Sequence, residues 1–340
     1  MGEFDLIERY FKAPARAMNK RASSGADGVN GVVLGIGDDC ALLQPAAGMQ
    51  LAVSTDMLVE GRHFLSTVDP YKLGHKALAV NLSDLAACGA RPLAFTLALA
   101  LPRADEAWLA PFSRGLLALA AEHHCELMGG DTTQGPLNIC ITVFGEVPNQ
   151  PSQALLRSGA TAGDDIYVSG TLGDARLALE VFRGNVALPA EAFTLARARM
   201  ETPTPRIALG MALRGVASAA IDVSDGLLGD LAHILHQSGV GAVIDTSIAI
   251  NLIAVKSINM PATPLFNPQK QLEFVLAGGD DYELAFTAPV AMRSAVQAAA
   301  TASGTPVTRI GQIQAEPGLR LVDGRGQSVP NHYGSFDHFK

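Results

Sequence analysis

Six short segments of the sequence combine aspartate with glycine, serine or threonine. They are GIGDDCALL (35–43), STD (54–56), NLSD (81–84), GGD (129–131), DVSDG (222–226) and GGDDYELAF (278–286). Aspartate holds its carboxylate close to the backbone, so such segments suit rigid sites for hard cations, which take oxygen ligands. Without a cation, two carboxylates about 5 Å apart would repel by roughly 3 kcal/mol at an effective dielectric of about 20. The pattern therefore predicts several bound Mg²⁺ ions, with ATP as the polyphosphate that completes their coordination.

Each segment has a simpler interpretation when it is taken alone. Asp-Gly and Gly-Asp pairs are usual in turns, and Ser-Asp-Gly before a helix is a usual N-cap. Asp164 and Asp165, for example, fit a turn that leads into a strand and receive no chemical role. Six such segments in one chain are harder to explain as turns, and this number favours the metal site.

The sequence contains none of the standard phosphate-binding loops. It has no Gly-x-x-x-x-Gly-Lys-Ser/Thr loop, no Gly-x-Gly-x-x-Gly after a first strand, and no His-Arg-Asp catalytic loop. Arg157 is the candidate for a direct phosphate contact, because a guanidinium group binds phosphate through two hydrogen bonds. His63, seven residues after Asp56, is a candidate substrate contact. A surface arginine and a polar loop histidine remain the alternatives for these two residues.

The hydrophobic pattern predicts an α/β (α+β) chain with mixed sheets. In the first half we expect a helix over 3–12, a loop to Gly31, strands at VVLGI and LAVSTD, a helix after Pro70, a strand over 93–101, a helix over 105–124 and a strand over 138–147. Asn81 and Asp84 share a face of the helix after Pro70, because they are three residues apart. In the second half we expect strands at 165–169, 218–222, 242–245, 282–287 and 307–311, with helices between them. The segment Val147–Gln153 resembles a linker, so we expect domains over 1–150 and 151–340.

Composition and charge exclude several classes of protein. The chain has 340 residues, of which 48% are hydrophobic, enough for two globular domains. Its net charge of −8, without a lysine- or arginine-rich run, argues against nucleic acid or an anionic membrane as the main partner. The longest apolar stretch, 93–101, is about half the length of a membrane helix. The acidic, amphipathic start lacks the features of a secretory signal, so we expect a cytoplasmic protein. The four cysteines are spaced for neither zinc nor a disulfide framework.

Several motifs together resemble those of the thiamine-monophosphate kinase family. They are GEFDLIERYF, GIGDDCALL, STDMLVEGRHF, KALAVNLSDLAACGARP, LMGGDTTQGPL, RSGA, AIDVSDGLLGDL, AGGDDYELAFT and the terminal FDHF. The resemblance runs nearly from end to end in the same order. It implies ATP- and Mg²⁺-dependent phosphorylation of thiamine monophosphate to thiamine diphosphate. It also implies the fold of aminoimidazole ribonucleotide synthetase and selenophosphate synthetase, with an N-terminal domain that pairs in a homodimer and a C-terminal α/β domain.

The same resemblance implies roles for individual residues of this chain. The implied Mg²⁺ ligands are Asp39, Ser54, Thr55, Asp56, Asp84, Asp131, Asp222 and Asp225. Of these, Asp84, Asp131 and Asp225 are the expected catalytic residues. The implied ATP contacts are Gly130, Asp131, Arg157 and Ser224, and the implied substrate contacts are His63, Asp280 and Tyr333. Asp280 and Tyr333 depart from the family pattern, which has glutamate and tryptophan there, although an aromatic ring at 333 still permits stacking.

Other activities of the superfamily are weighed against the kinase. A selenophosphate synthetase carries a reactive cysteine near its N-terminus, whereas Cys40 lies within GDDCALL; a hydrogenase-maturation relative ends in cysteine, whereas this chain ends in HFK. A ring-closing ligase of the aminoimidazole ribonucleotide synthetase type is the main alternative. A non-catalytic Mg-nucleotide-binding module is the other, although it has little need for so many metal ligands.

Overall fold

The structure is a computed structural model that describes residues 2–22, 31–149, 154–257 and 267–334. The chain folds into two compact units. The first comprises Met1–Leu85 and Ala90–Ser152, and the second comprises Ala86–Gly89 and Gln153–Lys340.

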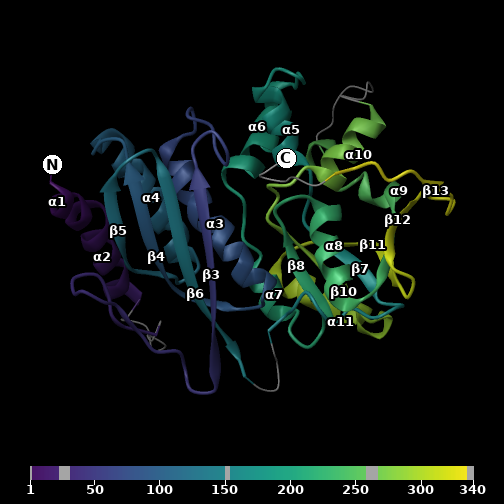
Figure 1. Ribbon diagram of the computed structural model, residues 1–340, viewed down its shortest axis with the longest axis horizontal. Helices are drawn as coiled ribbons and strands as arrows, with labels where there is room; N and C mark the ends of the chain where they lie inside the picture. The colour runs from purple at the N-terminus through teal and green to yellow at the C-terminus, as the bar shows by residue number, and fades with distance from the viewer. Residues whose placement is uncertain (1, 23–30, 150–153, 258–266, 335–340) are drawn as a thin grey trace. The chain divides into compact units, whose positions relative to one another are not determined.

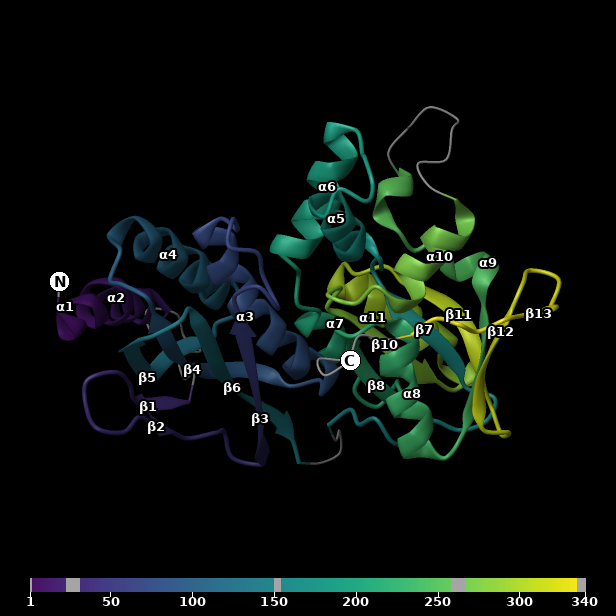
Figure 2. The same ribbon diagram turned by 45° about the horizontal axis from the view of Figure 1, so that its top comes forward.

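The first unit contains a four-stranded mixed sheet with helices on one face (Figures 1 and 2). Its elements are α1 (Glu3–Ile7), η1 (Glu8–Lys12), α2 (Ala13–Ala22), β1 (Val32–Leu34), β2 (Leu42–Leu43), β3 (Met49–Val59), α3 (Pro70–Ala87), β4 (Arg91–Leu101), α4 (Glu106–Glu122), β5 (Glu126–Gln134) and β6 (Asn138–Pro148). The strand order is β3-β6-β4-β5, so β3 and β5 form the two edges. β6 is antiparallel to both β3 and β4, whereas β5 is parallel to β4.

The core of this unit lies between the sheet and the pair α3 and α4. Alternate residues such as Leu97 and Ile141 are buried, as are most of the apolar residues of both helices. Gly115 lets the two helices approach closely, because a Cβ there would lie 1.9 Å from the Tyr71 carbonyl oxygen. The other face of the sheet is partly covered by Val32 and Leu43 of the β1–β2 hairpin.

The second unit contains a seven-stranded sheet of order β13-β12-β9-β11-β7-β10-β8. Its strands are β7 (Asp165–Ser169), β8 (Ala219–Val223), β9 (Gly241–Asp245), β10 (Glu283–Ala288), β11 (Val307–Gln314), β12 (Gly318–Val322) and β13 (Ser328–Val329). Its helices are α5 (Asp174–Phe182), α6 (Ala190–Glu201), α7 (Ile207–Ala212), α8 (Leu227–Ser238), α9 (Thr246–Ala249), η2 (Ala254–Ser257), α10 (Pro268–Ala277), η3 (Val290–Met292) and α11 (Arg293–Ser303). β12 runs parallel to β9, and the remaining neighbours are antiparallel. The α/β class with mixed sheets is therefore confirmed.

Three local expectations differ from the structure. Residues 13–22 form helix α2 where we expected a loop, because alanine, arginine and lysine favour helix and Pro14 is the second residue of α2, in the first turn, where proline is tolerated. β5 was not expected, since glycine interrupts its pattern at Gly129 and Gly130. The short strands β12 and β13 were not expected either. The rest of the expected loop, 23–30, lies outside the described residues. None of the described helices is long and apolar enough to cross a membrane.

Candidate active site

In the first unit, β3 and α3 bring two of the aspartate segments together. The Ser54 hydroxyl donates to the Asp84 carboxylate at 2.5 Å, which joins STD on β3 to NLSD on α3. The backbone N–H of Asp56 donates to the side-chain oxygen of Asn81 at 3.0 Å. Asn81 is itself buried and donates to the Ala77 carbonyl oxygen, so its amide is fixed in this orientation. The predicted shared face of Asn81 and Asp84 thus lies against β3.

The other predicted residues of STDMLVEGRHF are Thr55, whose side chain lies on the face of the sheet opposite to Ser54 and Asp56, and His63. Thr55 alternates with Ser54 and Asp56 along β3, and its hydroxyl lies 2.9 Å from that of Thr142 on the neighbouring strand β6. His63 follows β3, and its Nδ1 accepts a hydrogen bond from the backbone N–H of Val59 at 3.0 Å. This bond fixes the orientation of the imidazole ring.

Asp39 and the GGD segment occupy other parts of the first unit. Asp39 is exposed in the connection between β1 and β2. Gly130 and Asp131 lie within β5, where Asp131 pairs with Ala98 of β4. Asp56 lies on the opposite edge strand, with β6 and β4 between them, so about 14 Å of sheet separates the two aspartates at about 4.8 Å per strand. Within one chain, the structure therefore does not bring Asp131 to Asp56.

In the second unit, the segment DVSDG forms the end of β8 and the loop before α8. Asp222 is buried within β8, and Ser224 and Asp225 are partly exposed in the loop. One oxygen of Asp230, on α8, accepts hydrogen bonds from the backbone N–H groups of Ser224, Asp225 and Gly226. Burial, together with the nearby charge of Asp225, raises the pKa of Asp230 to about 7, although the three hydrogen bonds oppose this shift. We did not anticipate Asp230 from the sequence; the acid four residues after Gly226 was the available signal.

The segment GGDDYELAF packs directly against this loop. The backbone N–H of Asp280 donates to the Ser224 carbonyl oxygen at 2.7 Å, and that of Tyr282 donates to the Val223 carbonyl oxygen at 2.9 Å. Asp280 and Tyr282 have φ values of 62° and 51°, a strained region for residues with side chains. Gly279 permits the contact, because a Cβ there would lie 2.6 Å from the Ser224 carbonyl oxygen. The proposed nucleotide contact Ser224 and the proposed substrate contact Asp280 are therefore joined.

Buried polar and ionic contacts fix Asp281 and Glu283, which follow Asp280 in the segment GGDDYELAF. Glu283 is fully buried and accepts hydrogen bonds from Arg199, Arg206 and Ser169. Asp281 accepts from the backbone N–H of Gly173 at 2.9 Å, while its other oxygen has no partner among the described residues. Burial raises the pKa of Asp281 well above its usual value. Sequence reasoning assigned neither residue a role, because charge pairing across such distant parts of the chain leaves no local pattern.

Arg157 lies away from this pair of loops. Its backbone carbonyl oxygen accepts a hydrogen bond from Ser238, the last residue of α8, at 3.3 Å. Ser224 precedes the first turn of the same helix, which spans about 18 Å at 1.5 Å per residue. The Arg157 side chain is exposed at that far end.

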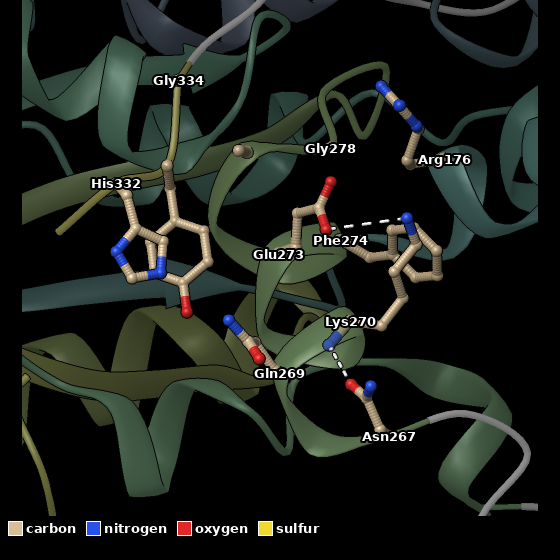
Figure 3. A pocket seen from close by; sticks show the side chains of 11 residues that line it. Arg176, Asn267, Gln269, Lys270, Glu273, Phe274, Gly278, His332 and Gly334 are labelled. Atoms are coloured by element: carbon tan, nitrogen blue, oxygen red, sulfur yellow. Dashed lines mark hydrogen bonds and ion pairs between the residues drawn. The ribbon is translucent and has the colours of Figure 1, made fainter. Parts of the chain in front are cut away.

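Tyr333 lines a cavity of about 440 Å³ in the second unit. Figure 3 shows this cavity, with Glu273 of α10 and the neighbouring His332 and Gly334 labelled. The cavity lies between α10, the following Gly278 and the segment His332–Gly334. The Glu273 carboxylate forms an ion pair with Lys270 at 3.7 Å on the α10 side. Burial and the nearby Glu273 raise the pKa of Tyr333. Gly278, which lines the cavity together with Tyr333, is two residues before Asp280 in the sequence.

The donor groups in both units suit Mg²⁺. Among the residues that the structure describes, no three histidine, cysteine, aspartate or glutamate side chains are grouped to hold a metal ion by themselves. Mg²⁺ is commonly bound through one or two carboxylates, with water and substrate phosphates completing its octahedral shell. Ser54 with Asp84 and Asp56 in the first unit, and Asp222 with Asp225 in the second, provide oxygen donors of this kind.

Comparison with known proteins identifies the family. Residues 37–147 match the model of the AIR synthase related protein N-terminal domain, and residues 161–324 match that of its C-terminal domain. The thiamine-monophosphate kinase of Salmonella typhimurium is 45% identical over 341 residues, covering 99% of this chain and 98% of the relative. The chain belongs to the thiamine-monophosphate kinase family. The Haemophilus influenzae member is 40% identical and covers 100% of this chain and 98% of its own length.

Solved structures agree with this membership of the thiamine-monophosphate kinase family. The crystal structure of thiamine-monophosphate kinase from Stenotrophomonas maltophilia K279a has a TM-score of 0.80 and 42% identity, covering 97% of this chain and 98% of that chain. A complex of AaThiL with AMPPCP and TMP has a TM-score of 0.72 and 28% identity, covering 99% and 97% of the two chains. The expected resemblance and the expected kinase class are thus confirmed.

Proposed function

We propose that this enzyme transfers the γ-phosphate of ATP directly to thiamine monophosphate, forming thiamine diphosphate and ADP. The observation that carries the proposal is the full-length match, at 40–45% identity, to enzymes named thiamine-monophosphate kinase. The related complex with AMPPCP and TMP supports it. Within the described residues, no feature favours the ring-closing ligase or the non-catalytic module over the kinase. A cytoplasmic location is proposed with this activity, because the reaction consumes ATP.

The reaction asks the protein for positioning more than for acid–base chemistry. The second pKa of a phosphate monoester is about 6, so the acceptor phosphate is largely ionised at neutral pH and no general base is needed. The remaining task is to hold two anions in line for transfer. When bound, Mg²⁺ supplies the positive charge that neutralises these phosphates. We propose Asp39, Ser54, Thr55, Asp56, Asp84, Asp131, Asp222 and Asp225 as the residues that hold it.

We assign separate groups of residues to the two substrates. Gly130, Asp131, Arg157 and Ser224 are proposed to contact ATP, and His63, Asp280 and Tyr333 to contact thiamine monophosphate. The cavity beside Tyr333 supports the last assignment, because it offers an aromatic face at a size suited to a ring. Asp84, Asp131 and Asp225 are the proposed catalytic residues.

We also propose a homodimer formed through the part of the four-stranded sheet that the β1–β2 hairpin leaves exposed, on the face opposite to α3 and α4. On β3, Leu51, Val53 and Met57 alternate with the residues under α3 and are 44%, 55% and 53% exposed. An apolar strip of this kind, on an edge strand, is typical of a surface that another chain covers. The occupant proposed here is a second copy of the same sheet.

A product balance tests the proposed function. With Mg-ATP and thiamine monophosphate, we expect ADP and thiamine diphosphate in a one-to-one ratio, with the labelled γ-phosphorus on thiamine diphosphate. A ring-closing ligase would instead release inorganic phosphate, a selenophosphate synthetase would leave AMP, and a binding module would leave ATP intact. Label recovered in free phosphate or on the protein, and absent from thiamine diphosphate, would exclude direct transfer.

A further inference from the structure

The loop Ser224–Gly226 is held by an unusual acceptor. One carboxylate oxygen of Asp230 receives three consecutive backbone N–H groups, at 3.0 Å from Ser224, 3.1 Å from Asp225 and 3.1 Å from Gly226. Asp230 is only 4% exposed, so water does not compete strongly for these donors. An ordinary helix cap satisfies one or two N–H groups with a short polar side chain at the N-cap position. Here the acceptor comes from inside the helix and fixes the whole loop.

The opposite side of the loop is equally constrained. The Ser224 carbonyl oxygen accepts from the Asp280 N–H, and the Val223 carbonyl oxygen accepts from the Tyr282 N–H. Gly226, with φ of 115°, lies against the backbone of Ala277, where an added Cβ would come within 3.0 Å. The loop is therefore enclosed by α8 and by the segment that leads into β10. Ser224 and Asp225 remain partly exposed, while their backbone groups point to fixed partners.

We propose that Asp230 is a positioning residue, which holds Ser224 and Asp225 in their ligand-binding arrangement before the nucleotide arrives. The inference rests on the proposed function in one respect only, the assignment of Ser224 and Asp225 to the Mg-nucleotide. It goes beyond that function because Asp230 has no role assigned in it and would act through the three backbone N–H groups that it accepts. A loop that is already ordered loses little conformational entropy when the ligand binds. The order should therefore increase the affinity for the nucleotide and improve the alignment of its phosphates for transfer.

The chain provides a matched control for this proposal. Asp164 is also 4% exposed, and its carboxylate accepts from the Thr161 N–H at 3.0 Å and from the Ser218 hydroxyl at 2.6 Å. It lies in the same unit and stabilises a turn to which no ligand contact is assigned. Asp164→Ala therefore removes a buried carboxylate without disturbing the Ser224–Gly226 loop.

The first measurement is amide hydrogen exchange in the protein without nucleotide or metal. In Asp230→Ala we expect the amides of Ser224, Asp225 and Gly226 to exchange at least about 10-fold faster than in the wild type. Asp230→Asn keeps a side-chain oxygen in the same place, so part of the protection returns. Asp164→Ala should leave these three amides unchanged. Wild-type exchange in the Asp230→Ala loop would overturn the proposal.

The second measurement is calorimetric binding of AMPPCP with Mg²⁺, together with steady-state kinetics. Loss of a residue that orients ligands typically lowers affinity or activity by about 10- to 100-fold, and we expect a loss of this size for Asp230→Ala. Asp230→Asn should retain an intermediate affinity and serves as the test if the alanine variant does not fold. Asp164→Ala should lose stability but keep the KM for ATP and kcat. An Asp230 variant that loses only stability, as the control does, would contradict a positioning role.

These outcomes separate the inference from the proposed function. If the wild-type protein binds AMPPCP but does not phosphorylate thiamine monophosphate, the proposed reaction fails while the exchange and binding results still judge Asp230. If the reaction occurs and the Asp230 variants bind AMPPCP with wild-type affinity, the reaction stands and the positioning role fails.

Discussion

At the scale of single residues, Asp84 combines a hydrogen bond within the fold with a charge that the proposed function would use. Asp84 accepts a hydrogen bond from Ser54, which any acceptor of the same shape would preserve. Asparagine would keep an acceptor oxygen of nearly the same shape and remove the negative charge. The replacement therefore isolates the charge, which is the property that the proposed metal would use.

We expect Asp84→Asn to keep the fold and to lower kcat by about 100-fold or more. The melting temperature without Mg²⁺ should be unchanged or slightly higher, because like-charge repulsion is relieved. Asp69→Ala is the matched control at the start of the same helix, where Asp69 accepts from the Tyr71 N–H at 2.8 Å. That variant should lose about 1 kcal/mol of stability and keep its turnover. Near wild-type turnover in Asp84→Asn would show that Asp84 is not a ligand.

Tyr333 provides a second test at the same scale. If its ring stacks on the acceptor, Tyr333→Ala should raise the KM for thiamine monophosphate about 10-fold, since an aromatic contact contributes about 1 kcal/mol beyond its buried area. The KM for ATP should hardly change. Tyr333→Phe keeps the ring and should behave like the wild type. Equal effects of Tyr333→Ala on both substrates would place the segment His332–Gly334 outside the acceptor site.

At the scale of elements, the sequence predicted the regular parts of the fold well. Periodic apolar residues predicted α3, α4, α8 and α10, and buried runs predicted β4 and β7. β5 escaped because Gly129 and Gly130 break its alternation, and only pairing with β4 makes it a strand. Sequence analysis detects local composition, so it found the short aspartate segments. It does not show which segments pair in the fold, so it missed β5.

The candidate site was also predictable only where its residues belong to recognisable local segments. The pairing of Ser54 with Asp84 joins segments that sequence analysis had singled out. Asp230 and Asp281 were not singled out, because their partners are backbone N–H groups with no signature of their own. Arg157 lies beside the C-terminal end of α8, where its carbonyl oxygen accepts a hydrogen bond from Ser238. This position depends on the path of the chain after the linker, which no local pattern describes.

The ionic network beneath β10 supports a prediction at this scale, because it connects α6, β7 and β10. Glu283→Gln should lower the free energy of unfolding by about 3 kcal/mol, since it leaves Arg199 and Arg206 without their buried counter-charge. Urea denaturation measures this loss. Glu316→Gln is the control, because Glu316 pairs with Arg320 but its side chain is 83% exposed, and should change stability by less than about 0.5 kcal/mol. Similar small losses in both variants would mean that the network contributes little.

At the scale of the whole molecule, the proposed homodimer depends on the exposed apolar residues of β3. Val53→Asp places a charge in the proposed interface from each copy and should raise the dimer dissociation constant by about 100-fold, equivalent to about 2.7 kcal/mol. Sedimentation at several protein concentrations measures the change. Val290→Asp is the control, because Val290 is similarly exposed in the second unit. A dimer of unchanged strength in Val53→Asp would move the interface to another surface.

The hydrogen bond between the Asp280 N–H and the Ser224 carbonyl oxygen couples the motions of the two loops for which we propose ligand contacts. A ligand that steadies one loop thereby lowers the entropy that the other must lose, so the two substrates should bind synergistically. Such coupling is reciprocal: ATP must strengthen the binding of thiamine monophosphate by the same factor by which thiamine monophosphate strengthens that of ATP. The ternary complex with both substrates would then be favoured over the complex with ATP alone. This preference would limit ATP hydrolysis when thiamine monophosphate is scarce.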